Sequence, residues 1–535
     1  MQGYFFDYIY LILFILGLVM IADRLRVAYP VVLVIGGLIL SFLKRFSGLS
    51  IEPEMVFYIF LPPLLYQASW QVSWKEFWRW RRVIFSFAFP IVLITATVVA
   101  VFSHLVIPGF TIALGFLLGG IVSPPDAVSA TTVMRQVGSP RRLISITEGE
   151  SLLNDASSLI IFRFALAAIL TGQFHFQQAL LDFVLIVVLG ILTGISVGLL
   201  IIGIHRWLPV TPSIQIVLTL VTPYIMYFIA EYFHFSGVLA VVSGGLLLSN
   251  KRQTLLTYQS RLQSVNVWTN IVFVLNGLVF LLIGLQLPSI INELGDISLK
   301  SAILYGLSIS FVLIITRLAC TLGASPFTRF MSRFIRVADP NPGWRAPLVY
   351  GWAGMRGVVS LAAALSIPVM ISDNQSFPYR NLILFITFIV ILVTLVLQGL
   401  TLPLVIRRVK PEIDDFTPDK DQELKLQRII AESSVGFLEK KYEEDLKTNS
   451  HLNVLYKRLK TDHEYLGRDL VISEETDGDL IKVFGMIYLD LLEHQRQIIN
   501  KLNLDSSYDE EIIRKYASMT DLEEFYVREK YLSSH

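Results

Sequence analysis

The chain has 535 residues, of which 54% are hydrophobic and 16% charged, and its formal net charge is +1. A mean hydropathy of +0.61 and repeated apolar runs of about 20 residues indicate a polytopic helical membrane protein and exclude a soluble enzyme. The near-zero net charge gives no reason to expect nucleic-acid binding, and no cofactor motif is evident. The single cysteine, Cys320, excludes an internal disulfide and a cysteine metal cluster.

Apolar stretches in the first 410 residues predict an all-α membrane domain with about thirteen transmembrane helices. The predicted spans are 4–22, 28–46, 54–72, 83–106, 109–134, 146–170, 179–204, 213–232, 235–249, 265–287, 299–320, 346–370 and 379–406. With the N-terminus outside, the inner loops carry seventeen Lys and Arg residues and the outer loops four. This positive-inside bias, together with an odd number of spans, predicts that the C-terminal tail lies in the cytoplasm. The protein itself is predicted to lie in the cell membrane.

The density of charged residues rises sharply near Pro411, because 45 charged residues lie in the last 125 positions and 42 in the first 410. We therefore predict a transmembrane domain over 1–410 and a cytoplasmic helical regulatory domain over 411–535. Within the second domain, apolar residues at helical spacing predict helices over 422–440 and 480–502, and 473–479 reads as an acidic connector.

Two predicted spans are interrupted by residues that break helices. The fifth contains Ser-Pro-Pro-Asp at 123–126, and the twelfth contains three glycines within 351–357. Because these spans are seven apart, they enter the membrane from opposite sides, as in an inverted repeat with two broken helices that cross near the midplane. Spans one to six would then correspond to spans eight to thirteen.

The sixth span carries carboxylates through an apolar segment, and intramembrane carboxylates are costly and usually functional. At 100° per residue, Ser151 lies one turn before Asp155 on one face, whereas Glu150 and Asn154 share another. Asp155 lies roughly 13 Å from the cytoplasmic end of the span at 1.5 Å per residue. A lone buried carboxylate such as Asp155 holds either a proton or a small hard cation, whereas Glu150 needs a permanent cationic partner.

Several of these motifs resemble the sodium/proton antiporters of the electroneutral monovalent cation:proton antiporter family. They are Leu-Pro-Pro-Leu-Leu-Tyr at 61–66, Glu-Gly-Glu-Ser-Leu-Leu-Asn-Asp at 148–155, Ser-Gly-Val-Leu-Ala-Val-Val at 236–242, and Gly-Met-Arg-Gly at 354–357. The likeness covers most of 1–410. It implies a homodimer with an inverted-repeat fold, in which Asp155 is the shared site of cation and proton. In that family, Asn-Asp at 154–155 marks the electroneutral branch.

The resemblance also implies roles for individual residues. The cation-site residues it implies are Asp155, Ser151, Asn154, Ser123 and Asp126. It pairs Glu150 with Arg356. This chain departs from many family members, which read Thr-Asp-Pro where it has Ser123-Pro124-Pro125, so a helix-capping role for Asp126 competes with ion contact.

Three further charged residues receive structural interpretations. Arg163 and Arg317 are predicted to extend toward the two membrane surfaces, and Glu231 at an outer helix end is predicted to be solvated.

The sequence thus predicts electroneutral exchange of Na⁺, with Li⁺ and K⁺ as further candidates, for H⁺ through one site, in the service of pH and sodium homeostasis. A K⁺-preferring antiporter is the alternative, since oxygen ligands alone do not fix ion size and Gln67 stands where some family members place an acid. A channel or membrane sensor with a signalling tail is the rival from another class. Membrane lipid and a second copy of the chain are the other expected partners.

Overall fold

A computed structural model describes the N-terminal part of the chain over residues 2–25, 29–43, 53–172, 176–295, 297–334, 339, 341–372 and 375–411. In the tail it describes stretches within 429–460, and residues 486–497 and 510–528. The chain divides into two units, Met1–Glu412 and Ile413–His535, and each is considered by itself.

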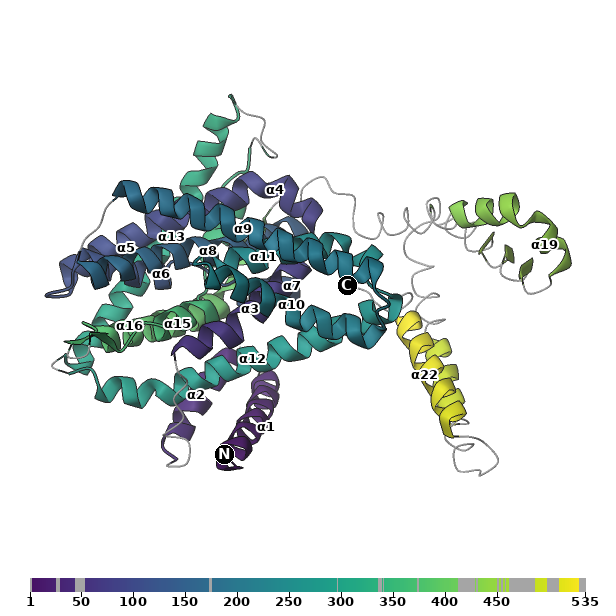
Figure 1. The fold of residues 1–535 in the computed structure, drawn as a ribbon, viewed down its shortest axis with the longest axis horizontal. Coiled ribbons are helices and arrows are strands. Elements are labelled where there is room, and N and C mark those ends of the chain that lie inside the picture. Colours follow the sequence, from purple (N-terminus) through teal and green to yellow (C-terminus); the bar gives the residue numbers. More distant parts are fainter. Residues whose placement is uncertain are drawn as a thin grey trace. The chain divides into compact units, whose positions relative to one another are not determined.

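Helices dominate the first unit (Figure 1). Before the first break they are α1 (Gln2–Leu25), α2 (Tyr29–Ser41), α3 (Pro53–Gln71), α4 (Trp74–Ser86), the π-helical turn η1 (Phe87–Ile91), α5 (Val92–Val106) and α6 (Ile112–Val122). Between the breaks they are α7 (Ala127–Gln136), α8 (Arg141–Thr171), α9 (Phe176–Trp207), α10 (Pro212–Tyr232), α11 (Gly237–Leu255), α12 (Tyr258–Asn292), α13 (Leu299–Met331) and α14 (Arg345–Trp352). After the second break come α15 (Val358–Leu365), the antiparallel strands β1 (Met370–Ser372) and β2 (Gln375–Ser376), α16 (Arg380–Val393), the π-helical turn η2 (Thr394–Gln398) and α17 (Gly399–Val409).

The all-α membrane class predicted from the sequence is confirmed. Within the described residues, eight helices are long and apolar enough to cross a membrane, and two shorter apolar helices cover Tyr29–Ser41 and Gly237–Lys251. Each of the thirteen predicted ranges overlaps a helix, although thirteen crossings remain a prediction. Both predicted breaks are present, between α6 and α7 and between α14 and α15.

Small residues allow neighbouring helices of the first unit to pack closely. A Cβ on Gly115 or Gly119 of α6 would lie 2.5 Å from a backbone oxygen of α5, and Figure 1 shows these two helices side by side. A Cβ on Gly194 of α9 would overlap the carbonyl oxygen of Ala240 in α11, and the same holds between α2 and α12. Such contacts between small residues are a main source of helix association in membranes, where burial of apolar surface contributes little.

Two π-helical turns interrupt otherwise regular helices, and each makes a hydrogen bond between a side chain and a backbone group of another segment. Ser157 of α8 donates its hydroxyl to the carbonyl oxygen of Ala88 in η1 over 2.5 Å. In η2, the Thr394 hydroxyl accepts the backbone N–H of Arg356 over 3.2 Å. Both π turns therefore contact the segments that carry the predicted site.

The described part of the second unit is helical. It includes α19 (Glu443–Thr448), helical residues 486–497 and α22 (Glu510–Val527). Arg496 Nη2 lies 2.7 Å from Asp521 Oδ1 and also binds Glu524, and Tyr488 donates its hydroxyl to Glu523 over 2.6 Å. These contacts hold residues 486–497 against α22. The predicted acidic connector 473–479 lies outside the described residues.

Candidate functional site

The first break is shaped by Asp126, the residue that precedes α7. Its Oδ1 accepts the backbone N–H of Val128 over 3.0 Å, and its Oδ2 accepts the Ser129 hydroxyl over 3.2 Å. Asp126 is therefore the N-cap of α7, a position where a carboxylate satisfies unpaired N–H groups and interacts favourably with the helix dipole. Of the two roles considered for Asp126, helix capping is observed directly.

The second break meets the first through backbone groups. The N–H of Asp126 donates to the carbonyl oxygen of Met355 over 2.7 Å. The Arg356 guanidinium donates from Nε to the carbonyl oxygen of Val122 over 2.8 Å and from Nη2 to that of Ser123 over 3.1 Å. These are carbonyls that the end of α6 leaves without intrahelical partners. Arg356, which is 0% exposed, thus caps one broken helix from within the other.

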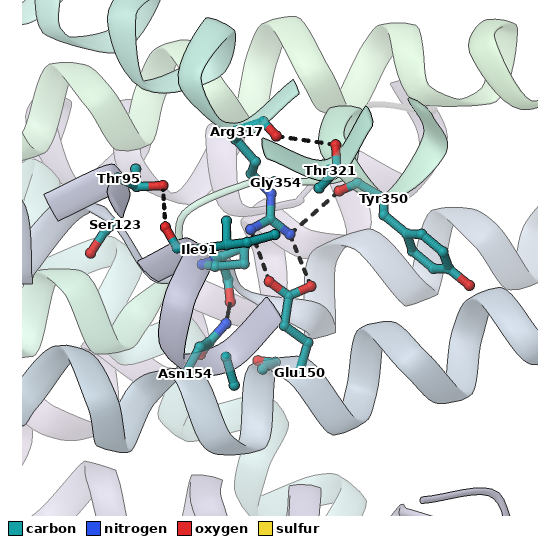
Figure 2. Close-up of polar contacts among 12 residues, drawn as sticks. Ile91, Thr95, Ser123, Glu150, Asn154, Arg317, Thr321, Tyr350 and Gly354 are labelled. Atoms are coloured by element: carbon teal, nitrogen blue, oxygen red, sulfur yellow. Dashed lines mark hydrogen bonds and ion pairs between the residues drawn. The ribbon is translucent and has the colours of Figure 1, made fainter. Parts of the chain in front are cut away.

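Helix α8 lies against the first break and contacts its backbone from two positions. The Ser151 hydroxyl oxygen accepts the N–H of Ala127 over 3.1 Å. Asn154 Nδ2 donates to the carbonyl oxygen of Pro125 over 3.1 Å, as Figure 2 shows. The structure therefore brings Ser151, Asn154 and the 123–126 segment together, and all of these belong to the site that the resemblance implies.

Asp155 follows Asn154 on α8, and its side chain is 7% exposed. Among the described residues, no cation and no hydrogen-bond donor contacts its carboxylate, although the Asp126 carboxylate is close enough to interact with it electrostatically. Two oxygens of this region, Ser123 Oγ and Asn154 Oδ1, are also buried without a hydrogen-bond partner in the described part of the chain. The region thus combines a buried carboxylate with unengaged oxygens, which suits a hard cation or a proton.

Glu150 pairs with Arg317, not with Arg356, so that part of the prediction was wrong. Arg317 Nη1 lies 2.8 Å from Glu150 Oε1, and Nη2 lies 3.0 Å from Oε2 (Figure 2). Both side chains are almost fully buried, at 3% and 1% exposure. Arg356 is unavailable for this pair because the carbonyls of the first break occupy its guanidinium. The expectation that Glu150 needs a permanent cation was correct, but the cation comes from α13.

Arg317 was missed because the end of its helix was misplaced. The prediction ended this span at 320, which put Arg317 near the membrane surface, but α13 continues to Met331. At 1.5 Å per residue, Arg317 lies roughly 20 Å from the end of a 33-residue helix. Beyond the predicted end, the helical spacing of Phe327, Phe330 and Phe334 was the available signal for a longer helix.

A second ion pair also differs from the prediction. Arg163 of α8 was expected to extend toward the surface and Glu231 of α10 to be solvated. Instead, Arg163 Nη2 lies 2.6 Å from Glu231 Oε1, and the same oxygen accepts the N–H of Gly237 at the start of α11 over 3.1 Å. The helix that carries Asp155 is thus joined to α10 and α11 by a partly exposed pair.

Comparisons with known proteins agree with this architecture. The family model described as "Sodium/hydrogen exchanger, transmembrane" matches residues 10–408. An uncharacterized Na⁺/H⁺ exchanger of Mycobacterium tuberculosis is 31% identical over 529 residues, which cover 94% of this chain and 92% of that protein. The Na⁺/H⁺ antiporter of Aphanothece halophytica is 33% identical over 72% of this chain and 70% of its own length. The sodium, potassium, lithium and rubidium/H⁺ antiporter of Bacillus subtilis is 34% identical over 70% of this chain and 57% of its own length.

The fold also has a counterpart among solved structures. The sodium proton antiporter MjNhaP1 from Methanocaldococcus jannaschii superposes with a TM-score of 0.58 at 18% identity, over 77% of this chain and all of that one. This likeness supports the fold as a whole, and the family match covers the residues that form both breaks and α8. The chain belongs to the sodium/hydrogen exchanger family of transmembrane cation/proton antiporters.

Proposed function

We propose that Asp155 is the single site at which Na⁺ and H⁺ compete. The observation that carries this proposal is the contrast between the two buried carboxylates of α8. Glu150 is neutralised by a fixed cation, Arg317, whereas Asp155 has none among the described residues. A buried carboxylate without a fixed partner is strongly destabilised as an anion. A mobile cation, either Na⁺ or a proton, would supply the missing charge.

The oxygens around Asp155 would complete the cation site. Ser151 and Asn154 from α8, and Ser123 from the end of α6, are candidates to offer oxygens to Na⁺, together with the Asp126 carboxylate. The unengaged Ser123 Oγ and Asn154 Oδ1 support this assignment. Hard cations prefer such oxygen donors. Asp126 holds the N-terminus of α7 through both carboxylate oxygens, so we assign it chiefly to orienting the break.

Exchange would follow from competition at one carboxylate. Na⁺ stabilises the ionised form of Asp155 and a proton neutralises it, so each displaces the other. The loaded site then carries the same net charge in both forms, and one cation crosses for each proton. Asn154, the neutral neighbour of Asp155, supports this electroneutral count.

Na⁺ is the proposed main cation, and K⁺ and Li⁺ are candidates because one relative is named for sodium, potassium, lithium and rubidium. A K⁺-preferring exchanger remains the second candidate, since the half-buried Gln67 offers an amide where a further carboxylate would favour a small cation.

Alternating access would move the two broken helices and α8 as one body. Backbone and guanidinium hydrogen bonds join the breaks to each other, and Ser151 and Asn154 join α8 to the first break. The close contacts between α9 and α11 and between α2 and α12 support a separate scaffold. The Arg163–Glu231 pair bridges these two bodies, so it would have to break or rearrange during the cycle.

We place the protein as a homodimer in the cell membrane, with the N-terminus outside and the tail inside, where it would serve pH and sodium homeostasis. It is a transporter rather than an enzyme and needs no cofactor. Residues 1–410 would carry out exchange, and 411–535 would regulate it.

The test is proton movement in proteoliposomes driven by an imposed Na⁺ gradient. Asp155→Asn should abolish this movement while the protein stays folded, because the substitution removes the titrating group with little change in volume. In detergent and weak buffer, Na⁺ should release about one proton from each wild-type chain, following one-site linkage, and none from the variant. Asp182→Asn, the same chemical change at an exposed position of α9, is the matched control. Substantial exchange by Asp155→Asn would refute the site assignment.

A further inference from the structure

Helix α4 precedes the apolar part of its span and presents three distinct faces. Its inner face consists of Phe77, Trp80 and Ile84, which are 5%, 2% and 0% exposed. This face packs on α8, where a Cβ on Gly149 would lie 2.6 Å from Ile84 Cδ1. The position of α4 is therefore fixed by the helix that carries Glu150 and Asp155, and its other two faces are turned outward.

The second face is a stripe of exposed aromatic rings. Trp74, Trp78 and Phe85 fall at positions i, i+4 and i+11, and they are 40%, 54% and 48% exposed. The two indole rings stack with centroids 5.6 Å apart, and Arg81 Cζ lies 4.8 Å from the Trp78 ring. Exposed tryptophans of this kind are typical of the boundary between acyl chains and headgroups.

The third face is a stripe of cations next to the rings. Lys75, Arg79 and Arg82 fall at positions i, i+4 and i+7, and all three are exposed. The acidic residue of the helix, Glu76, accepts the Trp80 indole N–H over 3.1 Å and so points toward the buried side. At 100° per residue the basic stripe lies opposite the buried face, with the aromatic stripe between them.

Helix length places these stripes at the membrane surface. The continuous helical run Trp74–Val106 has 33 residues, which corresponds to roughly 50 Å at 1.5 Å per residue. The hydrocarbon core of a bilayer is about 30 Å thick. The excess of roughly 20 Å equals the length of the 13-residue α4. Arg142, in the first turn of α8, stacks on Trp80 at 4.3 Å and pairs with Asp339 at 2.5 Å, so α4, α8 and the segment of Asp339 meet here.

We propose that the outer face of α4, formed by Trp74, Lys75, Trp78, Arg79 and Arg82, is a binding surface for anionic phospholipid headgroups. Both stripes would lie in the headgroup region, where the indole rings would contact lipid ester groups and the three cations would contact lipid phosphates. Amphipathic helices that combine these two features bind anionic membranes through both buried apolar area and charge. The rings favour a lipid over an acidic peptide or a soluble anion. The inference does not depend on how exchange occurs, but lipid held by α4 would act directly on α8.

The experiment measures thermal unfolding of the full-length protein in neutral detergent, with phosphatidylglycerol or phosphatidylcholine added. Phosphatidylglycerol should raise the unfolding temperature of the wild type more than phosphatidylcholine does, and native mass spectrometry should detect retained phosphatidylglycerol. Lys75→Gln/Arg79→Gln/Arg82→Gln should lose most of this difference and most of the retained lipid. Trp74→Ala/Trp78→Ala should lose part of it.

Two control variants make the result specific. Lys75→Arg/Arg79→Lys/Arg82→Lys keeps the charges and should keep the lipid effect. Arg407→Gln/Arg408→Gln/Lys410→Gln removes three exposed cations at the end of α17, where the neighbouring exposed residues are Leu400 and Leu404, and should also keep it. Exchange in phosphatidylcholine liposomes verifies that each variant is folded. A full phosphatidylglycerol effect in the Lys75/Arg79/Arg82 variant would overturn the proposal, as would an equal effect of soluble glycerophosphate on the wild type.

Discussion

The backbone at Gly357 passes so close to Asp126 that a Cβ at position 357 would lie 2.6 Å from Asp126 Cγ. The two broken helices therefore touch at a residue without a side chain. We expect Gly357→Ala to push Asp126 away from the N-terminus of α7 and to separate the breaks.

The cost of this substitution should be about 1–3 kcal/mol, as for other overpacked sites, and exchange should fall more than folded yield. Gly399→Ala is the control, because a Cβ there meets only Met355 Sδ at 3.5 Å. Exchange rate and unfolding temperature, measured for both variants, check the prediction. If the Gly357→Ala variant exchanged ions at the wild-type rate, transport would not depend on close contact between the two breaks.

The buried pair Glu150–Arg317 should dominate the stability of the region. Arg317→Met or Glu150→Gln alone strands a buried charge or dipole, at a cost of about 3–5 kcal/mol. The double variant should recover part of this loss, since neither charge then lacks a partner. Arg163→Met, which removes a pair whose arginine is 40% exposed, should cost at most about 1 kcal/mol. Denaturation in detergent would contradict this ranking if all three single variants were equally stable.

Exchange should be insensitive to voltage. With Asp155 as the one titrating group, the loaded site has equal charge with Na⁺ or with a proton. Liposomes clamped at different membrane potentials provide the measurement, because one net charge gains about 2.3 kcal/mol per 100 mV. A rate or reversal point that follows voltage would show that a second group, with Asp126 the first candidate, also releases a proton.

The contact between residues 486–497 and α22 should weaken in acid. Hydrogen bonds from Arg496 and Arg528 lower the pKa of Glu524 from its usual 4.5. A carboxylate whose pKa is lower in the folded state contributes stability above pH 4.5, and this contribution is lost as the pH falls through the lowered folded-state pKa. Hydrogen–deuterium exchange of residues 510–527, corrected for its intrinsic pH dependence, should therefore accelerate in that window. In the Glu524→Gln variant, hydrogen–deuterium exchange of residues 510–527 should be faster at neutral pH and should not accelerate in that window.

Truncation after Lys410 should preserve exchange and change its pH dependence or maximal rate, because every proposed cation-site residue lies before that point. The tail can bias transport only if its contacts differ between the two access states. A pH profile of full-length and truncated protein in matched liposomes, with folded protein quantified, is the measurement. Complete loss of exchange in a well-folded truncated protein would assign the tail to the transport machinery itself.

Much of this architecture could be read from residue types and spacing. Prolines and glycines at 123–126 and 351–357 free backbone groups, so both breaks could be placed. That Ser151 and Asn154 both contact the first break was implied by the family resemblance rather than by helical periodicity, which put them on different faces. Partner choice could not be read in this way. Whether Glu150 meets Arg317 or Arg356 depends on how three distant helices pack, and the hydropathy boundary at 320 concealed the true depth of Arg317. The correspondence of the two halves as inverted repeats remains a prediction.

The π turn η1 also determines which way α4 faces. A π turn is equivalent to one residue inserted into an α-helix, so positions before Phe87 are offset by one residue from the helical repeat of α5. Deleting one residue within Phe87–Ile91 would restore a regular helix and rotate α4 by about 100° relative to α5. Phe77, Trp80 and Ile84 would then leave α8, and a neighbouring stripe would replace them. The alignment of α4 with α8 is therefore encoded by a single extra residue, so that a deletion here should be far more harmful than any one substitution on the surface of α4.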